Sequence, residues 1–456
     1  MFVSLLQKNV CGECNRKDRA ERSQVVQESK SAKTGLPRPS AASTVSVHDL
    51  PTLEQLFSRP LPSALRIPAP VRVKWAHRYS RLLSDARYHN DYKHWMLVFM
   101  FEKVGLAAPR RGGKKHKSHY STQLDEWERD PVALWRKLEA CRPEQSFRVD
   151  NSPAARGKRA VAAARNGLAA RAVAALDSGA LATPGPETTA KLASKHPPKG
   201  KPIEHRNIDS LPSAQSAAIT EAIVEKSIRT FKRGTAARGL RAQHLIDALN
   251  SEAKAQFLTM FTRTVRFLAE GQVPVVFAPF VAGASLTPLD KSKNGVFDVR
   301  PIAAGEILRR VVAKCLCATQ KERAGKYFIA GGQYGVACVA GTERVIHQTR
   351  MVVRRETTTP PPAPGVEAKE HIERPAKLDF VILKVDLKNA FNRVSRHHVL
   401  KLVRAKFPAL ARWVTWCYGS DDPSCGSMEA SCAHRKACSR ATHSARCFLR
   451  WSSNSW

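Results

Sequence analysis

The residues best suited to chemistry lie at the end of one apolar segment. Phe380-Val-Ile-Leu-Lys-Val-Asp386 is a run that predicts a buried strand with a carboxylate at its carboxyl end. Mg²⁺ is a hard ion that prefers oxygen ligands held rigidly, and an aspartate at a strand end meets that need. Many α/β folds also end strands in aspartate, so Asp386 is a candidate metal ligand that needs further support.

Cations and cysteines supply the other candidate sites. Pro109 to Lys117 is a glycine-hinged loop suited to meeting phosphates or simply to solvation, and its cations are Arg110, Arg111, Lys114, Lys115 and Lys117. Cys11-Gly-Glu-Cys14 is a single pair, whereas a zinc site needs four ligands, so a leader without a metal is the main interpretation. The cysteines and histidines between Cys425 and Cys447 have spacings too long for a zinc knuckle, which stays the minor alternative.

Composition limits the class of protein. The 456 residues carry 75 Lys and Arg against 39 Asp and Glu, a net charge of +36, which points to nucleic acid as partner and, less well, to an anionic membrane surface. No apolar run is long enough to cross a bilayer, and Met1 to Leu6 lacks the cleavage site of a signal peptide. The 11 cysteines do not form a disulfide framework. We therefore expect a nuclear or cytoplasmic protein, neither secreted nor in a membrane.

The pattern along the chain predicts an α+β fold with five parts. These are a disordered leader (1–47), a basic helical module (48–145), a basic alanine-rich helical connector (150–206), a segment of mixed helices and strands (207–419) and an aberrant tail (420–456). The connector should hold one basic helix from Arg156 to Leu176 and a shorter one after Pro186.

Later helices follow from apolar spacing. The first should end at Gly271 and carry on one face Phe257, Leu258, Phe261, Val265 and Leu268. The second should begin at Ser395 and turn inward Val399, Leu400 and Val403. The third should run from Pro408 to Gly419 and bury Leu410, Trp413, Val414 and Cys417. The segment 356–376 should form an exposed loop.

Several motifs in order resemble the reverse transcriptases of non-LTR retrotransposons, with the nearest likeness to kinetoplastid-type, site-specific elements of the spliced-leader kind. They begin at Gly234, Asp298, Gly332 and Val385, and read GTAARGLRAQHL, DVRPIAAGEILRR, GQYGV and VDLKNAFNR. The resemblance covers roughly 150–419 and implies a fingers region followed by the start of a palm, with a mostly helical region before them. It also implies RNA-directed DNA polymerase chemistry with Mg²⁺, an RNA template, a DNA primer or target and deoxynucleotides.

The resemblance also gives roles to single residues. Asp386 would be the first catalytic carboxylate and would bind the metal with the carbonyl of Leu387, while Asn389 and Ala390 would lie under the triphosphate. Phe391 would be the steric gate against a ribose 2′-hydroxyl, or else a plain core aromatic. Arg300 and Lys291 would be fingers cations on the triphosphate, or else members of surface salt bridges, and Gln333 and Gly335 would shape the template path.

One required motif is missing. The family supplies its second carboxylates from a Tyr/Phe-x-Asp-Asp hairpin, whereas Tyr418-Gly-Ser-Asp-Asp422 has the wrong spacing and no apolar flanks. Back-translation of Lys436 to Cys447 two bases later admits the family's next palm motif, so we interpret the tail as an out-of-frame translation. We expect a truncated, inactive reverse transcriptase fragment; the alternatives are a non-catalytic basic nucleic-acid-binding protein and a misfolded pseudogene product.

Overall fold

The computed structural model describes the chain in segments. These are residues 45–58, 61–109, 116–140, 152–165, 169–177, 182–183, 185–195, 207–231, 239–292, 294–357, 385, 394–419 and 436–437. In this part the protein is mostly helical with one small sheet, in agreement with the predicted α+β class.

The first helices surround a set of aromatic side chains. They are α3 (Leu53–Ser58), α4 (Arg72–His89), α5 (Tyr92–Val104), α6 (His116–Arg129) and α7 (Pro131–Ala140), with 3₁₀ turns at Val47–Asp49 and Ala69–Val71. The side chain of Asp91 caps α5 by accepting a hydrogen bond of 2.8 Å from the His94 amide. α5 is apolar on nearly every side and is buried accordingly. Trp75, Trp95 and Phe101 are each no more than 1 % exposed, so these helices pack around aromatic rings.

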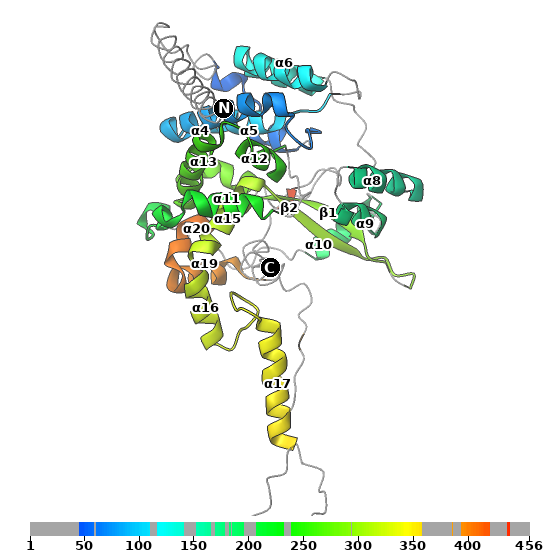
Figure 1. Cartoon of the computed structure of the whole chain (residues 1–456), viewed down its shortest axis with the longest axis vertical. Helices are drawn as coiled ribbons and strands as arrows, with labels where there is room; N and C mark the ends of the chain where they lie inside the picture. Colours follow the sequence, from blue (N-terminus) through cyan, green and yellow to red (C-terminus); the bar gives the residue numbers. More distant parts are fainter. Residues whose placement is uncertain are drawn as a thin grey trace, which may run out of the picture.

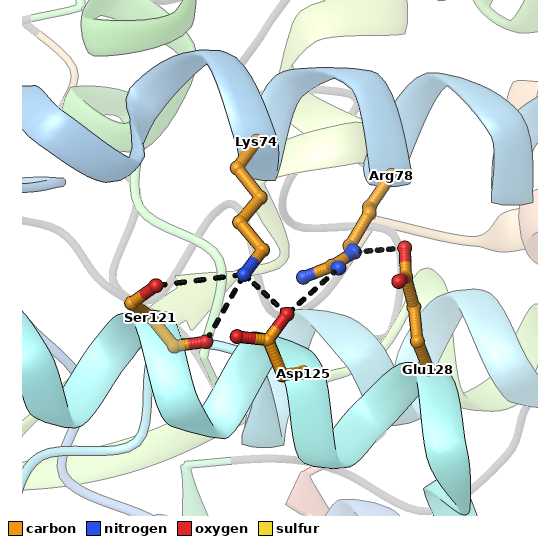
Figure 2. Close-up of polar contacts among 5 residues, drawn as sticks. All are labelled: Lys74, Arg78, Ser121, Asp125 and Glu128. Atoms are coloured by element: carbon orange, nitrogen blue, oxygen red, sulfur yellow. Dashed lines mark hydrogen bonds and ion pairs between the residues drawn. The ribbon is translucent and has the colours of Figure 1, made fainter.

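Ion pairs join α4 to α6 on the outside of this group. Figure 2 shows Lys74 and Arg78 of α4 reaching Asp125 and Glu128 of α6. The Arg78 guanidinium also lies 3.4 Å from Asp125, and Lys74 donates to the Ser121 carbonyl at 3.4 Å. The hydrogen bond from Lys74 holds the pKa of the Asp125 carboxyl below its usual value. These cations are therefore engaged in holding two helices together.

The second group of helices shares its core with the first. It contains α11 (Glu221–Arg229), α12 (Ala242–Leu249), α13 (Lys254–Ala269), α14 (Ala278–Val281), α15 (Ile307–Thr319), α16 (Lys321–Ala330), α17 (Gly341–Thr357), α19 (Arg396–Lys406) and α20 (Ala411–Tyr418). Four further 3₁₀ turns lie at Ile208–Ser210, Ser216–Ala218, Val275–Phe277 and Pro408–Leu410. One continuous cluster of buried apolar residues runs from Leu53 to Tyr418. The helices around 53–140 and those after 207 thus form one packed unit.

Buried polar contacts fix α12 against the first group. Asp247 accepts a 2.8 Å hydrogen bond from the Ile67 amide, and His244 donates through Nε2 to the Ala64 carbonyl at 2.7 Å. The Nδ1 atom of His244 accepts from the Arg241 amide, so the neutral ring satisfies both nitrogens. Burial lowers the pKa of His244 to about 4, which keeps the ring neutral. Gly239 precedes α12 at φ +141°, where a Cβ would lie 2.5 Å from the Glu102 carbonyl oxygen, so this close approach requires glycine.

Three of the predicted helices are confirmed. The five apolar residues expected on one helical face are buried in α13, and Gly271 follows its end at φ +69°. Ser395 caps α19 by accepting from the His398 amide, and Leu400 and Val403 are buried. α20 buries Trp413, Val414 and Cys417, although the segment begins with a 3₁₀ turn at Pro408.

The connector differs from its prediction at one point. The single helix expected over 156–176 is wrong, because α8 (Pro153–Arg165) and α9 (Ala169–Asp177) are separate helices that pack on each other. Asn166-Gly167 lies between them and is a strong turn dipeptide, whereas the alanine content alone favours an unbroken helix. The shorter helix after Pro186 is confirmed as α10 (Pro186–Ser194).

The sheet consists mainly of one antiparallel hairpin. β1 (Ala284–Asp290) pairs with β2 (Val299–Gly305), and a two-residue β3 (Lys436–Ala437) lies on the other side of β1. Figure 1 shows the hairpin extending from the helical body beside α8, α9 and α10, and α17 projecting in another direction. The hairpin is thus the part of the sheet that carries candidate site residues.

Candidate nucleic-acid interface

The hairpin register brings two predicted site residues to one face. Leu289 pairs with Arg300, and the Lys291 amide donates to the Asp298 carbonyl at 2.8 Å, so the same register continues to Lys291. Residues opposite one another across the hairpin share a face, which makes Lys291 and Arg300 diagonal neighbours, roughly 7–8 Å apart at the backbone. The structure therefore places together two cations that are nine positions apart in the sequence.

Burial on the other face turns these cations outward. Val299 is fully buried in a small apolar cluster with Ala182 and Leu192. Because successive strand residues point to opposite faces, Arg300 lies on the open face, and both Arg300 and Lys291 are exposed. Neither side chain forms an ion pair in the part of the chain that the structure describes. The surface salt bridge that was the alternative for Arg300 is thus not found there.

Lys195, the residue after α10, forms an ion pair with Asp298, the carboxylate opposite Lys291 in the hairpin. Its ammonium lies 2.5 Å from Oδ1 of Asp298 and also donates to the Val299 carbonyl. The hydrogen bond from Lys195 holds the pKa of the Asp298 carboxyl below its usual value, and the charge of Lys291 adds to this effect. Asp298 would otherwise have Lys291 as its cross-strand partner. Because Asp298 pairs with Lys195, its negative charge is already balanced, and the positive charge of Lys291 remains available on this face.

Arg309 of α15 fixes the base of the hairpin. Its guanidinium is buried, donates to the carbonyl of Ala282 just before β1, and donates to the phenol oxygen of Tyr418 in α20. The guanidinium carbon also lies 5.4 Å from the centre of the Tyr418 ring. Arg309 thus links the start of the hairpin to two helices of the body. Tyr418 is buried and forms part of this link.

Gln333 and Gly335 lie together in the turn between α16 and α17. The Gln333 side chain is exposed, and its Oε1 accepts a 2.7 Å hydrogen bond from the Gly335 amide. This contact shapes the turn itself. A template role for the two residues stays a prediction.

The remaining predicted site residues lie outside the described residues or at their edge. Outside are Asp386, Leu387, Asn389, Ala390 and Phe391, and also Arg110, Arg111, Lys114 and Lys115. Lys117 is in the first turn of α6, so the basic loop ends before it and the prediction of a loop there is wrong. Val385 is described and 62 % exposed, so the burial predicted for the segment 380–386 is not met at this residue.

Further basic side chains lie on α8. α8 carries Arg156, Lys158, Arg159 and Arg165, and Arg156 also donates to the Leu176 carbonyl of α9 at 3.4 Å. Figure 1 shows α8 and α9 on the same side of the body as the hairpin. Sequence reasoning identified the basic connector, but it missed Lys195 and Arg309 as positioning residues. The position of Lys195 just beyond a predicted helix gave no sign of its partner.

Magnesium ligands are not identified in the described residues. They contain no group of three or more His, Cys, Asp or Glu side chains arranged to hold a metal ion. No helix among them has the combined length and apolar character needed to cross a bilayer. No protein-family model, curated protein or solved structure matches the chain. The site is therefore interpreted from its own geometry.

Proposed function

We propose that this chain is an incomplete reverse transcriptase of the non-LTR retrotransposon type that binds nucleic acid without copying it. The observation that carries the binding part is the exposed pair of Lys291 and Arg300 on one face of the hairpin. The family part depends on the four sequence motifs, two of which contain Arg300 and Asp386.

The chemistry of the pair favours phosphate. A guanidinium offers a planar set of donors that matches two phosphate oxygens, and an ammonium adds a compact positive charge. Two cations on one strand face, roughly 7–8 Å apart at the backbone, can contact one phosphate or two phosphates of the same strand. The net charge of +36 attracts any nucleic acid to the surface, and the hairpin would then contact its backbone.

The lack of copying follows from the carboxylates. Two-metal phosphoryl transfer requires ligands for both ions, and the resemblance provides only Asp386 and the Leu387 carbonyl. When bound, Mg²⁺ would supply charge stabilisation for phosphoryl transfer. The residues that the sequence offers do not complete such a site.

Primer extension and filter binding together test the proposal. Purified full-length protein with Mg²⁺, an RNA template, a DNA primer and deoxynucleotides should extend the primer no more than the D386A variant does. The same preparation should retain labelled single-stranded nucleic acid at low salt and lose it steeply as salt rises. Extension that disappears in D386A would refute the inactive assignment, whereas failure to retain nucleic acid at low salt would refute the binding function.

A further inference from the structure

An apolar groove opens on the surface beside the point where the described chain begins. It has a volume of about 630 Å³ and lies between the 3₁₀ turn Val47–Asp49, the start of α3, Tyr92 at the start of α5, and the segment 275–280. Surface sites that hold small apolar groups have volumes of roughly 300–1,000 Å³. The groove is therefore large enough for several aliphatic or aromatic side chains.

The rim of the groove exposes valines. Val47 is 49 % exposed, Val275 57 % and Val276 47 %, while Leu53 and Phe280 at the floor are 5 % and 6 % exposed. The two neighbouring valines stand in the 3₁₀ turn Val275–Phe277, which follows Pro274. These three valines gather around an apolar hollow, which another apolar group could cover.

A segment of this chain has the right chemistry and is within reach. Met1-Phe-Val-Ser-Leu-Leu6 is an apolar run that neither the proposed nucleic-acid site nor the resemblance uses. The described chain starts at Val45, two residues before Val47 on the rim. The 38 residues between Leu6 and Val45 can span up to roughly 130 Å, so their length allows Met1 to Leu6 to reach the groove.

Tethering makes even weak contacts effective. Because the segment and the groove belong to one chain, their association is intramolecular, and this raises the effective concentration of each for the other. Phe2, Leu5 and Leu6 can each bury apolar surface at about 25 cal/mol per Å². Lys8 lies two residues beyond Leu6, and Glu54 lines the groove, so charge also favours this occupant.

We propose that Met1–Leu6 docks in the groove formed by Val47, Leu53, Tyr92, Val275, Val276 and Phe280 of the same molecule. This intramolecular contact goes beyond the proposed nucleic-acid binding and does not depend on it. It ties the amino-terminal segment to the junction of α3, α5 and α14.

Photo-crosslinking of the full chain tests this docking. Phe2 is replaced by p-benzoylphenylalanine, the dilute protein is irradiated, and the cross-linked peptides are identified by mass spectrometry. The expected product is a single-chain cross-link from position 2 to peptides containing 47–54 or 275–280. Cross-links spread evenly over the surface, or found mainly elsewhere, would overturn the proposal.

Two valine substitutions provide a matched comparison. V276D places a carboxylate at the groove rim and should lower the yield of the groove cross-link about tenfold, which corresponds to about 1.4 kcal/mol. V296D, at a valine that is 66 % exposed in the β1–β2 connection, should leave the yield unchanged. Equal urea midpoints for both variants show that the fold is retained. The L5D/L6D variant changes the docking segment in place of the groove, and should lower the cross-link yield in the same way. An unchanged yield in V276D, or a product containing two chains, would contradict docking within one molecule.

Discussion

Removal of the two hairpin cations should reduce the salt dependence of nucleic-acid binding. Lys291 and Arg300 are both exposed on one face, so K291Q/R300Q should leave the stability within about 0.5 kcal/mol of the parent. Each phosphate contact to a single strand contributes about 0.7 to the slope of log K against log salt. Loss of two contacts should therefore make the slope shallower by about 1.4.

The slope difference of about 1.4 also predicts how much more affinity the parent loses than the double variant as salt rises. Between 50 and 200 mM salt the parent should lose about seven times more affinity than the double variant, because a fourfold rise in salt acts on a slope difference of about 1.4. Filter binding of a labelled single strand at five or six salt concentrations measures both slopes. The double variant should bind more weakly than the parent, with the largest difference at low salt.

A control with the same loss of charge separates the hairpin from net charge. Lys137 lies 2.8 Å from Glu126 and Lys326 lies 2.7 Å from Glu322, so K137Q/K326Q removes two cations that already face carboxylates. This control should change the slope by much less than 1.4. Equal slope changes in the two double variants, or no change in K291Q/R300Q, would refute the reasoning that places phosphates at the hairpin.

Two further predictions concern the support of the hairpin and the half-buried Glu102 of α5. R309M removes the donor to the Ala282 carbonyl and the Tyr418 phenol, and should lower the free energy of unfolding by about 2–4 kcal/mol in urea titrations; an unchanged midpoint would contradict the buried link. Burial, with a smaller contribution from the charge of Glu306, raises the pKa of Glu102 to about 8, so the folded state keeps a proton that the unfolded state has lost. Stability should therefore fall as pH rises from about 4.5 to 8, by up to about 1.4 kcal/mol per pH unit, and E102Q should abolish this decline. A decline of the same size in E102Q would assign the pH dependence to another group.

Local sequence patterns were sufficient to predict helices whose position is decided by the burial of one apolar face. α13 and α19 have apolar residues at helical spacing and clear ends, so their buried faces could be predicted from the sequence. The separation of α8 from α9 was missed, because alanine and arginine favour helix on both sides of residues 166–168. A helix propensity averaged over many residues changes little when it includes one Asn-Gly dipeptide, so it still predicts a continuous helix.

The candidate site was only partly accessible from sequence. The types of Lys291 and Arg300 suggested phosphate binding, but their common face follows from the hairpin register. The register in turn depends on which residues of β2 are buried, and Val299 is buried by Ala182 and Leu192, more than 100 positions earlier. A one-residue shift of pairing would turn every side chain to the opposite face.

The charge of the hairpin face depends on a contact of the same range. Asp298 lies opposite Lys291 in the hairpin, and a pair between them would cancel much of the positive potential that phosphate requires. Lys195 instead binds Asp298 at 2.5 Å and also donates to the Val299 carbonyl, 104 positions away. The ammonium of Lys195 thus compensates the only carboxylate beside the two cations on this hairpin face, among the described residues. The phosphate-binding character of the face is therefore a property of the connector and the hairpin together, because the hairpin holds the two cations and Asp298, while the connector supplies the Lys195 that compensates Asp298.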